Sequence, residues 1–225
     1  MERSEIIFDP KVFDIDGTVL KKYNGRGNYV EIPTGVTEIG EKAFWHVYDM
    51  EEVSIPETVT KIGALAFVHN HKLKHITIPK SVTEIGDSVF YRCYYLKRVT
   101  ILGAVEKIGY ETFECCHSLS SVTLPDSLKE IGKIAFCLCP DLKSIKLPSG
   151  LESIGEQAFL RSGLTSVFIP KSVTKIDKVA FGFCDELRQI ACEAQEKPAG
   201  WSENWINEPQ WRGKTKAIWG SKKKN

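Results

Sequence analysis

Residues 76–98 read I-T-I-P-K-S-V-T-E-I-G-D-S-V-F-Y-R-C-Y-Y-L-K-R, and the pattern returns when the sequence is shifted by 23 residues in either direction. Seven copies begin at Val30, Val53, Ile76, Val99, Val122, Ile145 and Val167, and an eighth begins at Ile190. The steps are 23 residues except the sixth, which is 22 because one residue is missing between Phe159 and Leu164. Such a period is typical of stacked repeats that share one core.

Equivalent positions in the copies form columns that predict the path of one coil. Each copy starts with an aliphatic-x-aliphatic alternation, which predicts a short strand, and proline ends it in every copy except the fourth, which has Leu102. A second short extended segment precedes a glycine that suits a turn. We expect the 22-residue repeat to be a local irregularity that leaves both strand ladders unbroken, because its missing residue falls in a turn. Around the next column we expect one or two turns of α- or 3₁₀-helix, placing a phenylalanine ring in the core. That column is unbroken: Phe44, Phe67, Phe90, Phe113, Phe136, Phe159 and Phe181.

The consensus L-x-x-I-x-I-P-x-s-V-t-x-I-G-x-x-A-F-x-x-C resembles the leucine-rich repeats of the BspA-like, Treponema-type class, from Val30 to about Ile190. The resemblance implies an α/β repeat solenoid, a right-handed leucine-rich-repeat superhelix with short parallel strands and capped ends. It also implies a non-enzymatic scaffold for protein–protein interaction, often at bacterial cell surfaces, and so an adhesin-like role.

The repeats divide the chain into three parts. Residues 1–29 are expected to form a hairpin-like N-terminal cap, because Asp16-Gly17 is a hairpin-turn signal between alternating apolar residues. Residues 30–190 hold the seven repeats. Residues 191–225 are expected to form a tryptophan-rich C-terminal cap with a basic tail. An alternative for this end is a carbohydrate or ligand site built from Trp201, Trp205, Trp211 and Trp219.

Charge and hydropathy indicate which classes of partner and which cellular locations the sequence favours. The 30 basic and 29 acidic side chains give a net charge of +1, which does not favour nucleic acid. We expect no membrane span, because no run of 18 apolar residues occurs. The apolar run near the N-terminus is too short for a signal peptide, although the family resemblance implies secreted or surface relatives. The expected partner is therefore an unidentified protein, and no cofactor is implied.

One motif matches an enzyme family. Asp14-Ile15-Asp16-Gly17-Thr18 fits D-x-D-G-T, the first motif of haloacid-dehalogenase-like phosphatases, in which the first aspartate is the nucleophile and the second an acid/base around Mg²⁺. That chemistry needs a doubly wound α/β domain with later acidic residues and a lysine. Because the repeats follow directly, we interpret the motif as a turn in the cap, with a phosphatase as the less favoured alternative.

The cysteines and histidines follow the repeat. Four cysteines share the column three residues after phenylalanine, which favours buried structural thiols over a disulfide framework or a metal site: Cys93, Cys116, Cys139 and Cys184. His69 and His71 have the spacing of a metal chelate, but both occupy repeat columns. We therefore assign no catalytic and no metal-binding residue.

Two surfaces are candidates for contact with a partner. The first is an aromatic strip along one flank of the first four coils: Trp45, Tyr48, His71, Tyr91, Tyr94, Tyr95 and His117. Its rings either pack on one another and stiffen the turns, or they form an interaction patch. The second is the outward face of the first strand in each coil, which carries Thr77, Thr100, Thr123, Lys146 and Phe168.

Overall fold

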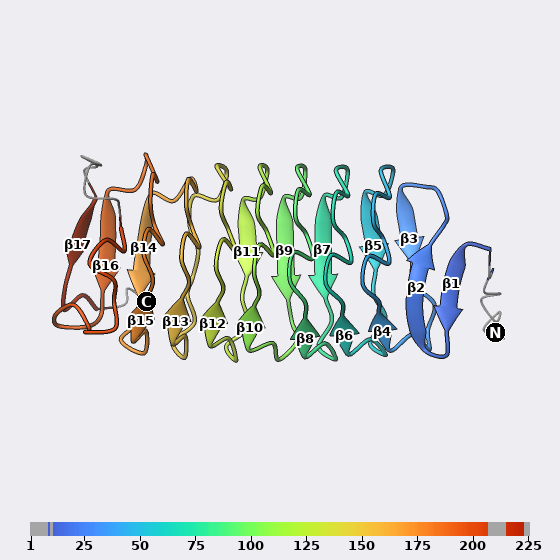
Figure 1. Ribbon diagram of the computed structural model, residues 1–225, viewed down its shortest axis with the longest axis horizontal. Coiled ribbons are helices and arrows are strands. Elements are labelled where there is room, and N and C mark those ends of the chain that lie inside the picture. The colour runs from blue at the N-terminus through green and yellow to red at the C-terminus, as the bar shows by residue number, and fades with distance from the viewer. Residues whose placement is uncertain (1–8, 10, 207–214, 223–225) are drawn as a thin grey trace.

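The computed structural model describes residues 9, 11–206 and 215–222, and it is a β-solenoid (Figure 1). We number coils 1–7 by the copies that begin at Val30 to Val167. An antiparallel hairpin precedes them, formed by β1 (Phe13–Asp16) and β2 (Val19–Tyr23). Its turn has Gly17 at φ 62°, a conformation that glycine adopts without strain. Residues 1–8, 10, 207–214 and 223–225, Trp211 among them, lie outside the described residues.

The first strands of the coils form one row, and the second segments form another (Figure 1). The first row consists of β3 (Tyr29–Glu31), β5 (Glu52–Ser54), β7 (His75–Ile78), β9 (Arg98–Ile101), β11 (Ser121–Thr123), β14 (Ser166–Ile169), β16 (Gln189–Cys192) and β17 (Lys216–Ile218). The second row continues from β2 and consists of β4 (Glu38–Ile39), β6 (Lys61–Ile62), β8 (Glu84–Ile85), β10 (Lys107–Ile108), β12 (Glu130–Ile131), β13 (Ser153–Ile154) and β15 (Lys175–Ile176). Apart from the hairpin, all these strand pairs are parallel.

The phenylalanine column runs along the solenoid axis as one stack of rings, as the repeat predicts. Neighbouring rings lie 4.9–5.5 Å apart between centroids, with planes within 16° of each other. All seven side chains are at most 1% exposed. Tyr23 of the hairpin covers the first ring at 5.3 Å, and Trp205 covers the last at 5.9 Å. Aromatic residues from outside the repeats therefore shield both ends of the stack.

The predicted helical turns were wrong: in the described residues no α- or 3₁₀-helix forms around the phenylalanines. Two residues with positive φ instead bracket each ring, four positions apart, such as Leu65 (φ 59°) and His69 (φ 62°) around Phe67. This geometry directs main-chain N–H groups to the next coil, where Phe67 donates to the Val89 carbonyl at 3.0 Å and His69 to that of Tyr91 at 3.0 Å. A helix would use these N–H groups within one coil.

The thiol column supports the same turn. Cys93 Sγ lies 3.1 Å from the Phe67 carbonyl oxygen of the preceding coil, and Cys116 Sγ lies 3.2 Å from that of Phe90. Asn70 fills the column in coil 2 and donates from Nδ2 to the Phe44 oxygen at 2.9 Å. Burial raises the pKa of the Cys93 thiol to about 12, so the thiol stays protonated and can donate.

The first strand row does not continue through the short repeat, contrary to the expectation that both ladders would pass it unbroken. Residues 142–148, from the end of coil 5 into coil 6, form no strand, although Ile145 and Leu147 remain buried. The shortened turn keeps two bonds to the preceding coil, from Gly163 to the Cys139 oxygen and from Thr165 to the Lys143 oxygen, both 3.0 Å. The next strand of the first row, β14, pairs with β16 and belongs to a different sheet from β11. The second row does pass through coil 6, from β12 to β13 to β15.

The second row has its own interruption between β8 and β10, which belong to different sheets. It lies in coil 4, where Leu102 and Gly103 replace the proline and the residue after it. A Cβ atom on Gly103 would lie 1.9 Å from the Val82 oxygen, so only glycine permits this close approach.

Charges alternate in sign along the second row. The residue before the buried isoleucine is Glu38, Lys61, Glu84, Lys107 and Glu130 in coils 1–5. Lys61 Nζ lies 3.7 Å from the Glu38 carboxylate and 3.6 Å from that of Glu84. Because these pairs are solvent-exposed, each contributes at most about 1 kcal/mol to stability. The alternation also favours the observed pairing of coils, because placing like charges directly opposite each other is destabilising.

The phenylalanine stack gives the first prediction. Phe113→Ala should lower the free energy of unfolding by about 3–5 kcal/mol, because a fully buried ring between two stacked neighbours is removed. Urea denaturation followed by circular dichroism measures the loss. Phe168→Ala is the control, because Phe168 lies half-buried on the open strand face and should cost less. Equal losses for the two variants would contradict a shared ring stack.

Candidate functional site

The aromatic strip is a continuous chain of ring contacts on the turns of coils 1–4. Its main line occupies the position four residues after each phenylalanine and runs from Tyr48 to His71, Tyr94 and His117. The ring centroids are 5.9, 4.7 and 4.9 Å apart in that order. The last two pairs are stacked, with planes 28° and 20° apart. Four coils therefore present one row of alternating phenol and imidazole rings.

A second line runs beside the first, two positions earlier in the turns of coils 1 and 2 and three positions earlier in that of coil 3. His46 and His69 have ring centroids 4.7 Å apart, and His69 meets Tyr91 edge-on at 5.8 Å. The two lines are joined where the Tyr48 hydroxyl lies 2.5 Å from His46 Nδ1. The rings are thus fixed by one another and by the coils that carry them.

Three rings project from this framework into solvent. Trp45 is 55% exposed, Tyr48 is 52% exposed and Tyr95 is 58% exposed. Tyr91 and Tyr94 are half-buried, and the Arg92 guanidinium lies 4.9 Å from the centre of the Tyr91 ring. The strip therefore combines a packed base with an exposed aromatic edge, and the exposed edge stays a candidate for contact with a partner.

Burial keeps the central imidazoles neutral. Desolvation lowers the pKa of His71, and the positive charges of His46 and Arg92 lower it further. The pKa of His69 is lowered for the same reasons, with His71 as an added charge. His71 Nε2 is buried without a hydrogen-bond partner among the described residues. A proton at this position would therefore be poorly solvated.

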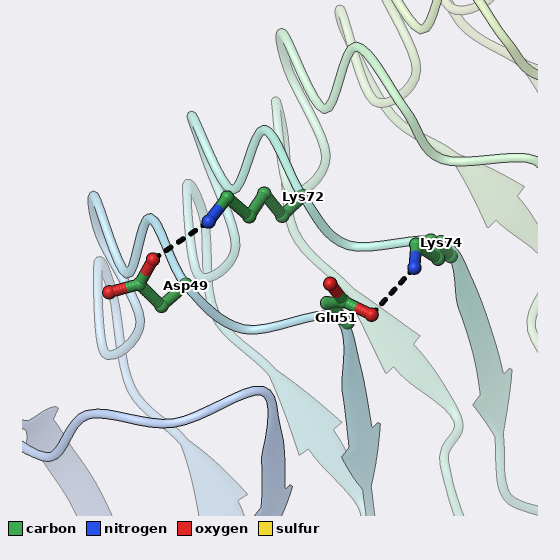
Figure 2. A network of polar contacts seen from close by, with 4 residues as sticks. All are labelled: Asp49, Glu51, Lys72 and Lys74. Atoms are coloured by element: carbon green, nitrogen blue, oxygen red, sulfur yellow. Dashed lines mark hydrogen bonds and ion pairs between the residues drawn. The ribbon is translucent and has the colours of Figure 1, made fainter.

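Ion pairs between coils lie beside the strip. Lys72 Nζ lies 2.9 Å from Asp49 Oδ1, and Lys74 Nζ lies 2.6 Å from Glu51 Oε2; both pairs are drawn in Figure 2. Each pair joins equivalent positions of coils 1 and 2. Both acidic groups at this end of the strip are thereby compensated.

The strand face carries the other predicted contact residues in two separate hollows. Thr77 and Thr100 line a hollow of about 600 Å³ that also contains Tyr29 and Leu102. Lys146 and Phe168 line another hollow of about 670 Å³, which extends from coil 6 to β16. Thr123 lines neither hollow and lies next to the interrupted part of the first row.

Some exposed apolar residues escaped the sequence interpretation. Tyr29 is 55% exposed and Leu102 is 47% exposed, both on the strand face. Leu102 stands where the other six copies have proline, and this departure was the sequence signal that could have identified it. Residues 22–26 of the hairpin lie against the turn of Trp45 and Tyr48, and no repeat column contains them.

The tryptophan-rich end packs into the solenoid. Trp201 and Trp205 are 3% and 4% exposed, and Trp201 Nε1 donates to the Val173 oxygen at 3.0 Å. Trp219 is partly buried and contacts Trp201 at 5.5 Å. These three rings therefore present little free surface for a sugar.

The aspartates of the phosphatase-like motif lie on a different framework from the one that chemistry needs. Asp14 and Asp16 are exposed on β1 of the antiparallel hairpin. Within residues 9, 11–206 and 215–222, no group of three or more His, Cys, Asp or Glu side chains could hold a metal ion. In the same part of the chain, no helix is long and apolar enough to cross a membrane.

The strip gives a matched pair of predictions at adjacent residues. Tyr94→Ala should destabilise the fold by about 1–3 kcal/mol, because two stacked ring contacts are lost. Tyr95→Ala should change stability by less than about 0.5 kcal/mol, because its ring is 58% exposed. Thermal unfolding of both variants at one pH measures the difference. Equal effects would mean that the stack does not support the turns.

The lowered pKa of His71 predicts a pH dependence. Between the lowered folded value and the ordinary value near 6.5, the unfolded chain binds the proton and the folded chain does not. Stability should therefore fall as the pH drops below about 6.5. His71→Phe keeps a ring in the stack but cannot titrate, so its melting temperature should fall less between pH 7.5 and 5.5. An identical fall in both proteins would exclude His71 as a cause.

The comparisons with known proteins agree with this architecture. The solved structures include a leucine rich cell surface protein from Faecalibacterium prausnitzii, with 31% identity and a TM-score of 0.73, which covers 86% of this chain and 54% of that chain. A leucine-rich repeat protein from Eubacterium ventriosum has 26% identity and a TM-score of 0.70, and the match covers 83% of this chain and 49% of that chain. One from Bacteroides ovatus has 27% identity and a TM-score of 0.66, covering 91% and 59%. The chain thus spans about half the length of these relatives.

No curated protein matches the sequence. The family described as the BspA type leucine rich repeat region matches with six copies, over residues 15–139 and 106–198. These ranges hold most of the chain and all seven phenylalanines of the stack. The chain therefore belongs to the BspA type leucine-rich repeat family.

Proposed function

We propose that this chain is a non-enzymatic scaffold that binds another protein through the aromatic strip of coils 1–4. The observation that carries the proposal is the exposed edge of the strip, where Trp45, Tyr48 and Tyr95 are each more than half exposed on one flank. Tyrosine and tryptophan are the side chains most often found as anchors at protein interfaces, because they bury a large area with few rotatable bonds.

The packed base of the strip supports this use. Tyr94 is held between His71 and His117, and the Tyr48 hydroxyl is held by His46. A partner would meet rings that are already positioned, so little conformational entropy is lost on binding. The family to which the chain belongs consists of repeat scaffolds, which agrees with a binding role.

An adhesin-like role is a narrower form of the proposal and requires the chain to reach a cell surface. The Faecalibacterium prausnitzii relative is a cell surface protein. The buried thiols are compatible with an oxidising exterior, because burial raises their pKa values and a protonated thiol is a poor nucleophile. Whether or not the chain reaches a cell surface, the proposed binding surface is the aromatic strip.

The test compares three forms of the purified chain against one partner. Affinity capture with the native chain supplies the partner, whose affinity is then measured by biolayer interferometry. Tyr95→Ser with His117→Ser should weaken binding at least about 30-fold, the loss expected for an anchor worth 2 kcal/mol. Tyr29→Ser is the control, because Tyr29 is equally exposed but lies on the strand face.

Two results would contradict the proposal. Unchanged affinity in the double variant would show that the Tyr95 and His117 end of the strip makes no contact, which contradicts binding along the strip of coils 1–4. A loss confined to Tyr29→Ser would move the binding surface to the strand face. Melting temperatures of all three forms ensure that a loss of binding is not a loss of fold.

A further inference from the structure

A hollow lies where the N-terminal hairpin meets the first turn of the solenoid. It has a volume of about 440 Å³ and is formed by residues 22–26 of the hairpin and residues 45–49 of coil 1. The Tyr23 N–H donates to the Ala43 oxygen at 2.7 Å, and the Asn24 N–H donates to the Val12 oxygen at 2.7 Å. The first bond ties the hairpin to coil 1, and the second fixes Asn24 within the hairpin side of the hollow.

Two exposed aromatic rings stand on one wall of the hollow. Trp45 and Tyr48 are both more than half exposed, and both contact His46, whose ring centroid lies 4.6 Å from that of Trp45 and 5.2 Å from that of Tyr48. His46 therefore holds both rings in place before any ligand arrives. Exposed, immobilised aromatic faces beside a hollow are suited to stacking with the apolar face of a ligand.

The opposite wall contains an unused polar group. Tyr23 lines the hollow; its ring is buried, and its hydroxyl makes no hydrogen bond to another described residue. A Cβ atom on Gly25 would lie 2.4 Å from this hydroxyl oxygen, so the chain can pass over the ring only with glycine. The hydroxyl can donate a hydrogen bond to a ligand and accept one from it.

The rim of the hollow is positively charged. Lys22 and Arg26 have no ion-pair partner among the described residues, whereas the Asp49 carboxylate is compensated by Lys72 at 2.9 Å (Figure 2). Asn24 adds an amide that can both donate and accept. The lining therefore offers two cations without ion-pair partners among the described residues, Lys22 and Arg26, and one carboxylate that Lys72 compensates. The Tyr23 hydroxyl and the Asn24 amide can each donate and accept hydrogen bonds.

We propose that this hollow binds an acidic saccharide, a sugar ring that carries one carboxylate. The C–H face of the sugar ring would stack on Trp45, and its hydroxyls would pair with Tyr23, Asn24 and Asp49. The carboxylate would lie against Arg26, whose planar guanidinium matches its two oxygens. The volume accommodates one or two sugar rings. This site goes beyond the protein-binding proposal: it shares Trp45 and Tyr48 with the exposed edge of the strip and adds the residues of the hairpin side.

A nucleotide is the competing ligand, because it also stacks on aromatic rings and binds cations. The Asp49 carboxylate disfavours a nucleotide more than an acidic sugar, because a phosphate monoester carries about −1.5 to −2 charges and a sugar carboxylate carries one. Sugar hydroxyls, in contrast, donate to a carboxylate. The mixture of acceptors and donors around one aromatic wall therefore favours a polyhydroxylated ligand.

Isothermal titration calorimetry of the full chain against glucuronate, N-acetylneuraminate, glucose and AMP tests the proposal. At least one acidic sugar should bind, and glucose and AMP should each bind at least about tenfold more weakly. Trp45→Ala should abolish sugar binding. Arg26→Gln should weaken the acidic sugar to the level of glucose without affecting glucose itself. Tyr95→Ala, an exposed ring of the strip outside the hollow, should change nothing.

Three results would overturn the proposal: no heat with either acidic sugar, a preference for AMP, or unchanged binding by Trp45→Ala. The melting temperature of Trp45→Ala should stay close to that of the native chain, because the ring is exposed. Failure of the protein-binding proposal is recognised separately, since its variants at Tyr95 and His117 leave this hollow intact.

Discussion

The hydrogen bonds that link the turns of successive coils are the constraint on which the rest of the solenoid depends. In the part of the chain that the structure describes, fourteen non-glycine residues adopt positive φ, and Ile134 and Val179 among them are β-branched, for which this conformation is least favourable. Each such residue costs about 1–2 kcal/mol. The conformation persists because it lets the N–H groups of each turn reach carbonyls of the next coil while the phenylalanine remains in the core.

This arrangement explains why the ends need structures of their own. Alternate N–H groups of the turns in coils 1–7 donate to the C-terminal neighbour, so the last coil needs acceptors beyond itself. Val179 donates to the Asn204 oxygen at 2.9 Å and Phe181 to the Trp205 oxygen at 3.2 Å. At the other end, Tyr23 of the hairpin donates to the first coil at Ala43. The residues that shield the ring stack thus also complete its hydrogen bonds.

The sequence pattern was sufficient for the solenoid, its period and its core, because those depend on side-chain burial and recur in every copy. It was insufficient for the turn conformation. Residues such as Lys42, Leu65 and Glu111 carry no glycine-like signal, and their positive φ is imposed by the neighbouring coils. The interruption of the first row in coil 6 was missed for a related reason, because pairing depends on how the coils stack.

The candidate site divides in the same way. The strip could be assembled from repeat columns, since equivalent positions must lie side by side in a solenoid. Whether a ring packs or projects could not be assigned from the columns, because Tyr94 and Tyr95 are adjacent in sequence and differ only in direction. The hollow beside Trp45 could not be assigned at all, because Asn24 and Arg26 belong to the hairpin and have no counterparts in the coils.

The alternating charges have a consequence for how such a chain can change length. Glutamate and lysine take turns along the second row in coils 1–5, and tyrosine and histidine take turns along the strip in coils 1–4. Duplicating a single coil there would place like charges in contact and two identical rings together. Duplicating two coils would preserve both alternations. In this region the smallest segment that can be gained or lost without mismatch is therefore a pair of coils, twice the period of the backbone.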